Sequence, residues 1–287
     1  MTSTIFISAK PRSLVVFLAL AFGISWIVWI PTALASYGLV SFQIDSNLSG
    51  LLGAFGPFLA TLITTAIYEG RAGFSTLFKR LLTWRVGIQW YLFVLFWPAV
   101  LSLAKTGIAV VLGSAVPNFR NRLLYSFILY PPNSNTTPFI VFLPFVFLQQ
   151  MLIGSSMGEE PGWRGYALPR MQAHQSSLRA SLLLGLLWSV WHFPLWLTKG
   201  HPMQETFLGW SVLGLMATTV LFTWVYNHTK GSLLLALLFP TSIAITGLFL
   251  ASAETHPLID VALSGGVVVL VIAVFGPKRL SREATGA

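Results

Sequence analysis

The stretch LVVFLALAFGISWIVWIPTALAS, residues 14–36, contains no charged side chain. About 20 consecutive apolar residues suffice for a helix to cross the hydrocarbon core of a bilayer, so this stretch predicts a transmembrane helix. Runs of the same character continue along the chain, and the predicted spans are 14–36, 48–68, 87–104, 138–160, 180–198, 206–227, 231–252 and 258–276. They predict an all-α polytopic membrane protein, a bundle of about eight transmembrane helices in a single integral-membrane domain, residues 1–287.

The composition of the 287 residues supports this prediction. Hydrophobic residues make up 55% of the chain, charged residues only 9%, and the mean hydropathy is +0.76. A soluble globular domain normally has about a quarter of its residues charged, so that class is excluded, as is a disordered chain. The chain has no cysteine, which excludes disulfides, thiolate metal sites and a cysteine nucleophile.

The basic residues predict the orientation of the spans. With a cytoplasmic N-terminus, four of the 17 lysines and arginines fall outside the cell, and the other thirteen fall inside. The four outer residues are Lys105, Arg120, Arg122 and Lys199, and the inner ones include Lys10 and Arg282. This asymmetry is the positive-inside pattern. It predicts a multi-pass protein of the plasma membrane with both termini cytoplasmic, and it assigns the net charge of +9 to membrane lipids and topology instead of nucleic acid.

Residues 71–85, between the second and third spans, have an amphipathic pattern. Phe74, Leu77, Phe78 and Leu81 follow helical spacing, while the basic residues Lys79, Arg80 and Arg85 are expected to remain on a polar face. The pattern predicts a helix lying along the inner membrane interface.

Ionisable residues next to apolar spans are costly, at about 2.5–3.5 kcal/mol each, and therefore indicate function. The first group is Glu159-Glu160-Pro161-Gly162-Trp163-Arg164. In a helix, Glu160 and Arg164 are placed to form an i,i+4 ion pair, and Glu159 points about 100° away from Glu160. A carboxylate left without a cationic partner suits a general base. The alternative is a solvated charge cluster at a helix end.

The second group is Trp188-Ser189-Val190-Trp191-His192-Phe193-Pro194. Trp188 and His192 share a helix face, and His192 lies roughly 19 Å along the helix from Arg179. A lone histidine on an apolar helix is often an ordinary core residue. However, the fourth and fifth spans are joined by a short segment and run antiparallel, so Glu159 and His192 are expected at similar depth. We expect the two side chains to share one water molecule.

These two groups resemble the motifs of the CPBP family, which comprises CAAX prenyl endopeptidases and bacteriocin-processing (ABI) intramembrane proteases. Glu159-Glu160 followed by Arg164 matches the first motif, and Trp188 followed by His192 matches the second, with Trp in place of the usual Phe. The CPBP-like core is about residues 138–252. The resemblance implies that Glu159 and His192 activate water to hydrolyse a peptide bond, and that Glu160, Arg164 and Trp188 have orienting or structural roles. It also implies a peptide or membrane-protein substrate, prenylated in some family members.

The chain departs from the third family motif, a His followed four residues later by Asn. These positions are occupied by Pro240 and Ala244. In the family the two side chains are assigned to the oxyanion hole, or the His to a metal. Loss of one oxyanion donor costs about 10²–10³ in rate. Pro240 should also kink the seventh span, and the hydroxyls of Thr241 or Ser242 are weaker substitute donors.

The family resemblance also raises a divalent metal such as zinc as a cofactor. A catalytic zinc normally has three protein ligands. The spans offer Glu159 and His192, with Glu160 as a further carboxylate, so a full ligand set is not predicted. Three functions stay open: an intramembrane endopeptidase, a weakened or inactive pseudoprotease that binds membrane or lipidated peptides, and a transporter whose buried Glu, Arg and His relay protons.

Overall fold

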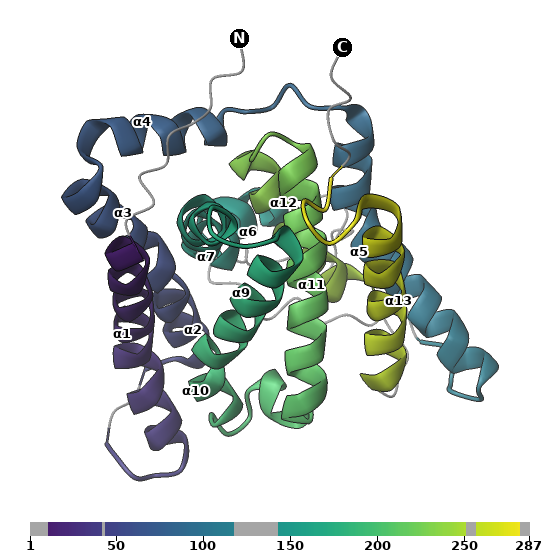
Figure 1. Cartoon of the computed structure of the whole chain (residues 1–287). Coiled ribbons are helices and arrows are strands. Elements are labelled where there is room, and N and C mark those ends of the chain that lie inside the picture. Colours follow the sequence, from purple (N-terminus) through teal and green to yellow (C-terminus); the bar gives the residue numbers. More distant parts are fainter. Residues whose placement is uncertain (1–10, 42–43, 118–142, 251–256, 282–287) are drawn as a thin grey trace.

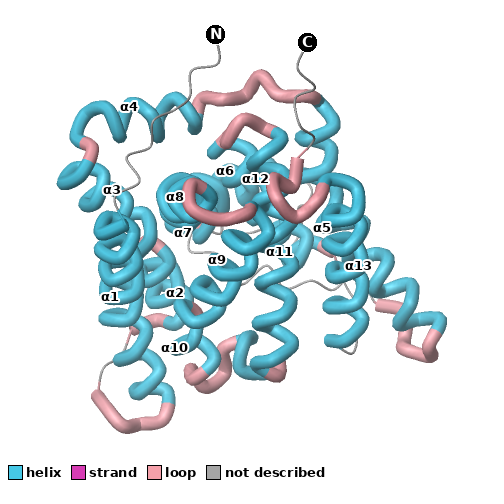
Figure 2. Tube along the Cα trace, in the orientation of Figure 1, coloured by secondary structure: helices cyan, strands magenta, loops and turns pink. Residues whose placement is uncertain are grey.

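The computed structural model describes residues 11–41, 44–117, 143–250 and 257–281. Within these ranges the regular structure is entirely helical (Figure 2). The elements are α1 (Pro11–Ser36), α2 (Ser46–Ala54), α3 (Gly56–Tyr68), α4 (Gly70–Leu81), α5 (Ile88–Val111), α6 (Leu143–Leu152), α7 (Ser155–Glu160), the π-helical segment η2 (Pro161–Ala167), α8 (Leu168–Gln172), α9 (Ser177–Trp191), α10 (Phe193–Trp196), the 3₁₀ turn η3 (Pro202–Glu205), α11 (Leu208–His228), α12 (Leu233–Phe249) and α13 (Pro257–Phe275). The all-α prediction is confirmed.

The described helices fit a multi-pass membrane protein. Five segments are long and apolar enough to span a bilayer: Arg12–Ser36, Leu48–Tyr68, Ile88–Val111, Leu208–His228 and Pro257–Phe275. Two shorter apolar helices cover Ser177–Trp191 and Leu233–Leu248. Each of the eight predicted runs overlaps at least one of the helices, although residues 138–142 of the fourth run lie outside the described residues.

Two predicted spans are interrupted. The fourth is broken after α6, where Gly154 has an extended backbone with φ −83° and ψ −168°, and helix then resumes as far as Gln172. The fifth was predicted to run to residue 198, but α9 ends at Trp191. Pro194 has no N–H to donate to the carbonyl of Val190, so the hydrogen bonds of α9 are interrupted, and a separate helical turn, α10, begins at Phe193.

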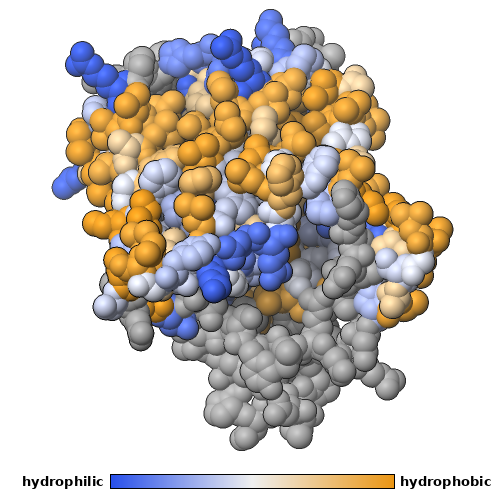
Figure 3. All heavy atoms as spheres, turned by 90° about the horizontal axis from the view of Figure 1, so that it is seen from below, coloured by the Kyte–Doolittle hydropathy of each residue, from blue (hydrophilic) through white to orange (hydrophobic). Residues whose placement is uncertain are grey.

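The outer surface is apolar, as expected for side chains that face lipid. Ile27 on α1 is 75% exposed and Val111 at the end of α5 is 86% exposed. Seen from below, most of the described surface is covered by apolar side chains, and hydrophilic residues gather in a central patch and at the edge (Figure 3). Contiguous apolar surface of this extent is rare on a water-soluble monomer, and a bilayer accounts for it.

The helices form a bundle around the segment α7–η2–α8 (Figure 1). This segment packs between α3 and α12, while α9 packs against α11 and α1 against α3. The helix α4 lies across one end of the bundle, the end at which α1 begins and α13 ends (Figure 1). Of the cations used to predict orientation, Lys10, Arg120, Arg122 and Arg282 lie outside the described residues.

The predicted amphipathic helix at residues 71–85 is present as α4, with one correction. Phe74 and Phe78 are exposed where lipid would contact them, and Lys79 is exposed as well. Arg80 was expected on the polar face, but it is only 6% exposed. Its guanidinium points into the bundle and binds the segment that carries the candidate site.

Two glycines let the central segment approach its neighbours closely. A Cβ atom at Gly158 would lie 2.6 Å from the carbonyl oxygen of Ala54, and one at Gly162 would lie 2.6 Å from Cβ of Pro57. Both distances are shorter than van der Waals contact, so neither position accepts a side chain without a backbone shift. Small residues four apart on one helix face are typical of closely packed membrane helices. They place α7 and η2 against the junction of α2 and α3.

Candidate active site

Glu159 lies in the last turn of α7, on the side that faces α9. Its Oε2 accepts a hydrogen bond of 2.7 Å from the indole Nε1 of Trp188. The side chain is buried but retains 8% of its surface. Glu159 and Trp188 are 29 residues apart in the sequence, so this bond fixes the relative depth of the two helices. Helix continues past Arg164, beyond the predicted end of the fourth span, since residues 155–172 are helical throughout.

His192 directly follows the last residue of α9. This helix begins after the cap Ser176, whose Oγ accepts a hydrogen bond from the backbone N–H of Arg179. The Nδ1 atom of His192 lies 2.9 Å from the carbonyl oxygen of Trp188. Because a carbonyl can only accept, this contact assigns the ring proton to Nδ1 and leaves the lone pair on Nε2. The Nε2 atom has no hydrogen-bond partner among the described residues.

Trp188 is therefore bonded to both predicted reactive residues. Its side chain donates to Glu159 and its main-chain carbonyl accepts from His192. The rings of Trp188 and His192 also lie 5.4 Å apart between centroids. The structure thus links Glu159 and His192 through Trp188.

Glu160 and Arg164 form the predicted ion pair. Nη1 of Arg164 lies 2.8 Å from Oε1 of Glu160, and both side chains are only 1% exposed. The guanidinium also lies 4.3 Å from the ring centroid of Phe222 and 4.8 Å from that of Trp188, which are cation–π distances. The alternative of a solvated charge cluster at a helix end is excluded for this pair, because both groups are buried.

Several polar atoms of this ion pair still lack a protein partner. Nε and Nη2 of Arg164 and Oε2 of Glu160 are buried and make no hydrogen bond to other described residues. Unpaired buried polar groups are costly, and in native proteins they are usually satisfied by ordered water. The pair is therefore polar enough to support water beside Glu159, within an otherwise aromatic environment.

Arg80 on α4 supports this segment from outside. Pro169 has no N–H, so the carbonyl of Gly165, four residues earlier, lacks the helical donor that residue 169 would otherwise supply. Arg80 donates to this carbonyl from Nη1 over 2.9 Å, and to the carbonyl of Arg164 from Nη2 over 3.1 Å. Its remaining donors bond to the carbonyl of Gly231 and the hydroxyl of Tyr226. Sequence reasoning missed this role, because the pattern of α4 alone does not distinguish Arg80 from Lys79.

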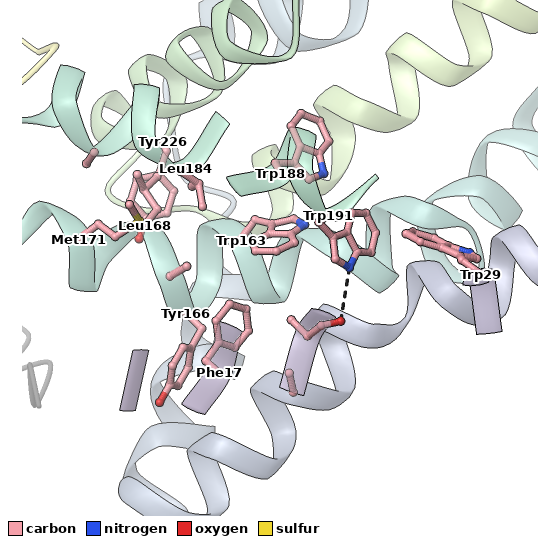
Figure 4. Close-up of a cluster of buried hydrophobic side chains, with 14 residues drawn as sticks. Phe17, Trp29, Trp163, Tyr166, Leu168, Met171, Leu184, Trp188, Trp191 and Tyr226 are labelled. Carbon is pink, nitrogen blue, oxygen red and sulfur yellow. Dashed lines mark hydrogen bonds between the residues drawn. The ribbon is translucent and has the colours of Figure 1, made fainter. Parts of the chain in front are cut away.

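A buried cluster that includes Trp188 also contains aromatic side chains from α1 (Figure 4). The Trp163 ring makes edge contacts with Phe17 and Trp191, at 5.8 and 5.6 Å between centroids. Trp191 donates from Nε1 to the carbonyl of Ala21, the bond drawn dashed in Figure 4. Trp29 on α1 lies nearly parallel to the His192 ring, at 6.2 Å and 15°. The contribution of α1 was also missed from sequence.

The third motif positions lie on α12, where Pro240 falls inside the helix. Neither Pro240 nor Ala244 has a side-chain hydrogen-bond donor. Oγ1 of Thr241 lies 2.8 Å from Oγ of Ser156 and 2.7 Å from the carbonyl of Leu237, and Oγ of Ser242 donates to the carbonyl of Leu238. Both hydroxyls are thus engaged within the protein. None of these hydrogen bonds directs the hydroxyl of Thr241 or Ser242, the two substitute donors considered from the sequence, toward Glu159 or His192.

The side chains of the site do not fit a zinc centre. Among the described residues, no group of three or more His, Asp or Glu side chains is close enough to hold a metal ion. Glu160 is committed to Arg164, which leaves Glu159 and His192 as donors. Catalytic zinc usually has three protein ligands.

Comparison with known proteins agrees with the motifs. Residues 136–239 match the model of a family described as Type II CAAX prenyl endopeptidase Rce1-like. The matched segment contains Glu159, Arg164, Trp188 and His192, and it ends at Phe239, directly before Pro240. CAAX prenyl protease 2 of Methanococcus maripaludis is 31% identical over 153 residues, which are 50% of this chain and 54% of the relative. The chain thus spans about half the length of that relative. By both its motifs and these similarities, the chain resembles the CPBP family of membrane proteins related to CAAX prenyl endopeptidases.

Proposed function

We propose that this protein is an intramembrane endopeptidase in which Glu159 and His192 activate water. The observation that carries the proposal is Trp188, which bonds to the carboxylate of Glu159 and to Nδ1 of His192. This leaves the second oxygen of Glu159 and Nε2 of His192 as two basic atoms for the same task. A carboxylate and a neutral imidazole are suitable general bases when they are held at one site.

In the proposed reaction, water loses a proton to Glu159 while His192 orients it through Nε2. The hydroxide oxygen attacks the peptide carbonyl carbon, and the C–N bond then breaks. The leaving nitrogen takes up the proton that Glu159 accepted, so the products are a carboxylic acid and an amine, which become a carboxylate and an ammonium group by proton transfer between them, and Glu159 is ionised again. The buried Glu160–Arg164 ion pair holds η2 and the Arg164 charge next to the carboxylate of Glu159. It does not contact the reacting atoms in this mechanism.

The proposed substrate is a membrane-inserted or lipidated peptide. The relative in Methanococcus maripaludis is named a CAAX prenyl protease, which supports a prenylated C-terminal peptide as the first substrate to test. The site lies in a segment surrounded by apolar helices, so a substrate that partitions into lipid reaches it more readily than a soluble peptide. We further propose a plasma-membrane location with both termini cytoplasmic, on the basis of the distribution of basic residues.

A second candidate function is supported by Pro240 and Ala244. Without a donor at these positions, the negative oxygen of the tetrahedral intermediate lacks stabilisation that is typically worth about 10²–10³ in rate per donor. The same site would then bind a membrane or lipidated peptide without cleaving it at a useful rate. This pseudoprotease function uses the same site residues and the same class of ligand.

Restoring the third motif tests which function applies. The protein is reconstituted in liposomes and offered membrane-inserted peptides with and without a C-terminal prenyl group. We expect slow product formation by the unaltered protein and at least about 100-fold faster cleavage by Pro240→His/Ala244→Asn, because one regained donor is worth that much. Mass spectrometry of the products is the measurement. The endopeptidase proposal fails if neither protein cleaves, and cleavage by the double variant alone supports the pseudoprotease.

A further inference from the structure

A polar cavity lies at the end of the bundle that carries α4, away from the Glu159 site. Its volume is about 660 Å³, which is in the range of ligand-binding pockets. Four segments meet there: the end of α4, the turn between α8 and α9, the turn between α11 and α12, and the residues that follow α13. It is lined by Arg80, Gln172, Gln175, Ser176, Ser177, Tyr226, Asn227, Lys230, Gly231, Lys278, Arg279 and Ser281.

The cavity is strongly basic. Arg80, Lys230, Lys278 and Arg279 contribute four positive charges, and none of the lining residues is acidic. Within the described part of the chain, no carboxylate lies within 4.0 Å of the Lys230, Lys278 or Arg279 side chain. These three residues are exposed, so their charged groups are available to a ligand.

Arg80 contributes a positive charge to the cavity, but its hydrogen-bond donors are mostly used within the protein. Its guanidinium is already hydrogen-bonded to protein carbonyls and to Tyr226. Burial, and to a smaller extent the nearby charge of Arg170, lowers the pKa of Arg80 to about 10. It therefore remains protonated at neutral pH and adds a fixed positive charge to the wall.

Hydrogen bonds hold the cationic segments in place. The carbonyl of Lys278 accepts from the N–H of Ser177 over 2.9 Å, and that of Arg279 accepts from Nδ2 of Asn227 over 2.7 Å. Leu280 is completely buried and anchors the segment after α13. Lys230 has a positive φ of 55°, within the tight turn between α11 and α12. The cations therefore converge on one cavity from separate, anchored turns.

This arrangement differs from a scattered positive-inside surface. Arg12, Arg71 and Lys79 are exposed cations that do not line the cavity. Diffuse surface charges attract anionic lipids weakly, and salt screens them over about 8–10 Å. Basic pockets between transmembrane helices, by contrast, are suited to anionic headgroups. The amide of Gln175 and the hydroxyl of Ser176 lie on the same wall and are of the type that bonds to phosphate oxygens.

We propose that this cavity binds a phosphate group, either in the headgroup of an anionic phospholipid or as free phosphate. Its position beside the interfacial helix α4 allows a lipid headgroup to enter while the acyl chains stay in the bilayer. The inference concerns a site separate from Glu159 and holds whether or not the protein is a protease.

The experiment measures binding of short-chain phosphatidylglycerol, short-chain phosphatidylcholine and inorganic phosphate to the purified full chain in neutral detergent, by native mass spectrometry and thermal shift. The test variant is Lys230→Gln/Lys278→Gln/Arg279→Gln. The matched control is Arg12→Gln/Arg71→Gln/Lys79→Gln, which removes the same charge from exposed positions outside the cavity. Arg80 is left intact because it also supports the fold.

We expect the cavity variant to bind phosphatidylglycerol roughly 100-fold more weakly, on the basis of about fivefold per lost cation, and the control to change less than about threefold. Phosphatidylcholine should bind the unaltered protein more weakly than phosphatidylglycerol does. If inorganic phosphate binds the unaltered protein and competes with the lipid, the ligand is the free ion; if only the lipid binds, it is the headgroup. Equal losses in the two triple variants, or equal binding of the two lipids, would overturn the proposal.

Discussion

Replacing Glu159 by glutamine is expected to lower the rate of peptide cleavage by about 10²–10⁴, the usual contribution of a general base. The amide oxygen of glutamine can still accept the hydrogen bond from Nε1 of Trp188, so the link between α7 and α9 should persist. What the amide cannot do is accept a proton from water at neutral pH. The change therefore removes the proton acceptor while preserving the size of the side chain and its hydrogen bond to Trp188.

The cleavage assay in liposomes measures this loss, and Glu205→Gln is the matched control. Glu205 is an exposed carboxylate in η3, and its replacement should leave the rate within about twofold. Circular dichroism and thermal unfolding of both variants establish that the fold is intact. A Glu159→Gln protein that cleaves as fast as the unaltered chain would remove Glu159 from the mechanism.

Replacing Arg80 by methionine is expected to destabilise the protein by about 3–6 kcal/mol, because at least three backbone carbonyls lose their donor at once and each unsatisfied group costs about 1–3 kcal/mol. The carbonyls are those of Arg164, Gly165 and Gly231. Methionine preserves much of the apolar stem, so the loss reports on hydrogen bonds. Arg80→Lys should be intermediate, since one ammonium group cannot reproduce the planar fork.

Thermal and denaturant unfolding in detergent measure the effect on stability. Lys79→Met is the control, because Lys79 is the adjacent basic residue of α4 and is exposed. It should change stability by no more than about 0.5 kcal/mol. If Arg80→Met has the same stability as the control, the guanidinium does not stabilise the fold through the carbonyls of Arg164, Gly165 and Gly231.

The fold class was predictable because apolar runs of about 20 residues have few alternatives to membrane helices. The breaks were harder to predict. Gly154 and Pro194 lie inside apolar runs, and hydropathy is insensitive to backbone geometry, so the fourth and fifth spans were each predicted as one uninterrupted helix. Pro194 was visible in the sequence as a helix breaker, whereas the extended backbone at Gly154 depends on packing.

Within the site, the contacts that could be predicted were those between residues close together in the sequence. The Glu160–Arg164 pair is i,i+4 on one helix, so spacing was sufficient. The bond between Glu159 and Trp188 joins residues that are 29 apart in the sequence. It was not predicted, because only the expected antiparallel arrangement of two spans related these residues to each other. The bonds of Arg80 span 84 to 151 residues. Nothing local to α4 indicates them, and the stacking of Trp29 on His192 is likewise a result of tertiary packing.

The central claim is that Glu159 and His192, joined by Trp188, act as one unit on water. A double-mutant cycle of Glu159→Gln and His192→Gln in the liposome cleavage assay tests it most directly, in the Pro240→His/Ala244→Asn background if the unaltered chain is slow. Groups that act as a unit have strongly non-additive effects. The predicted result is a double variant with about the same residual rate as the slower single variant. Losses that multiply across the two positions would contradict the claim.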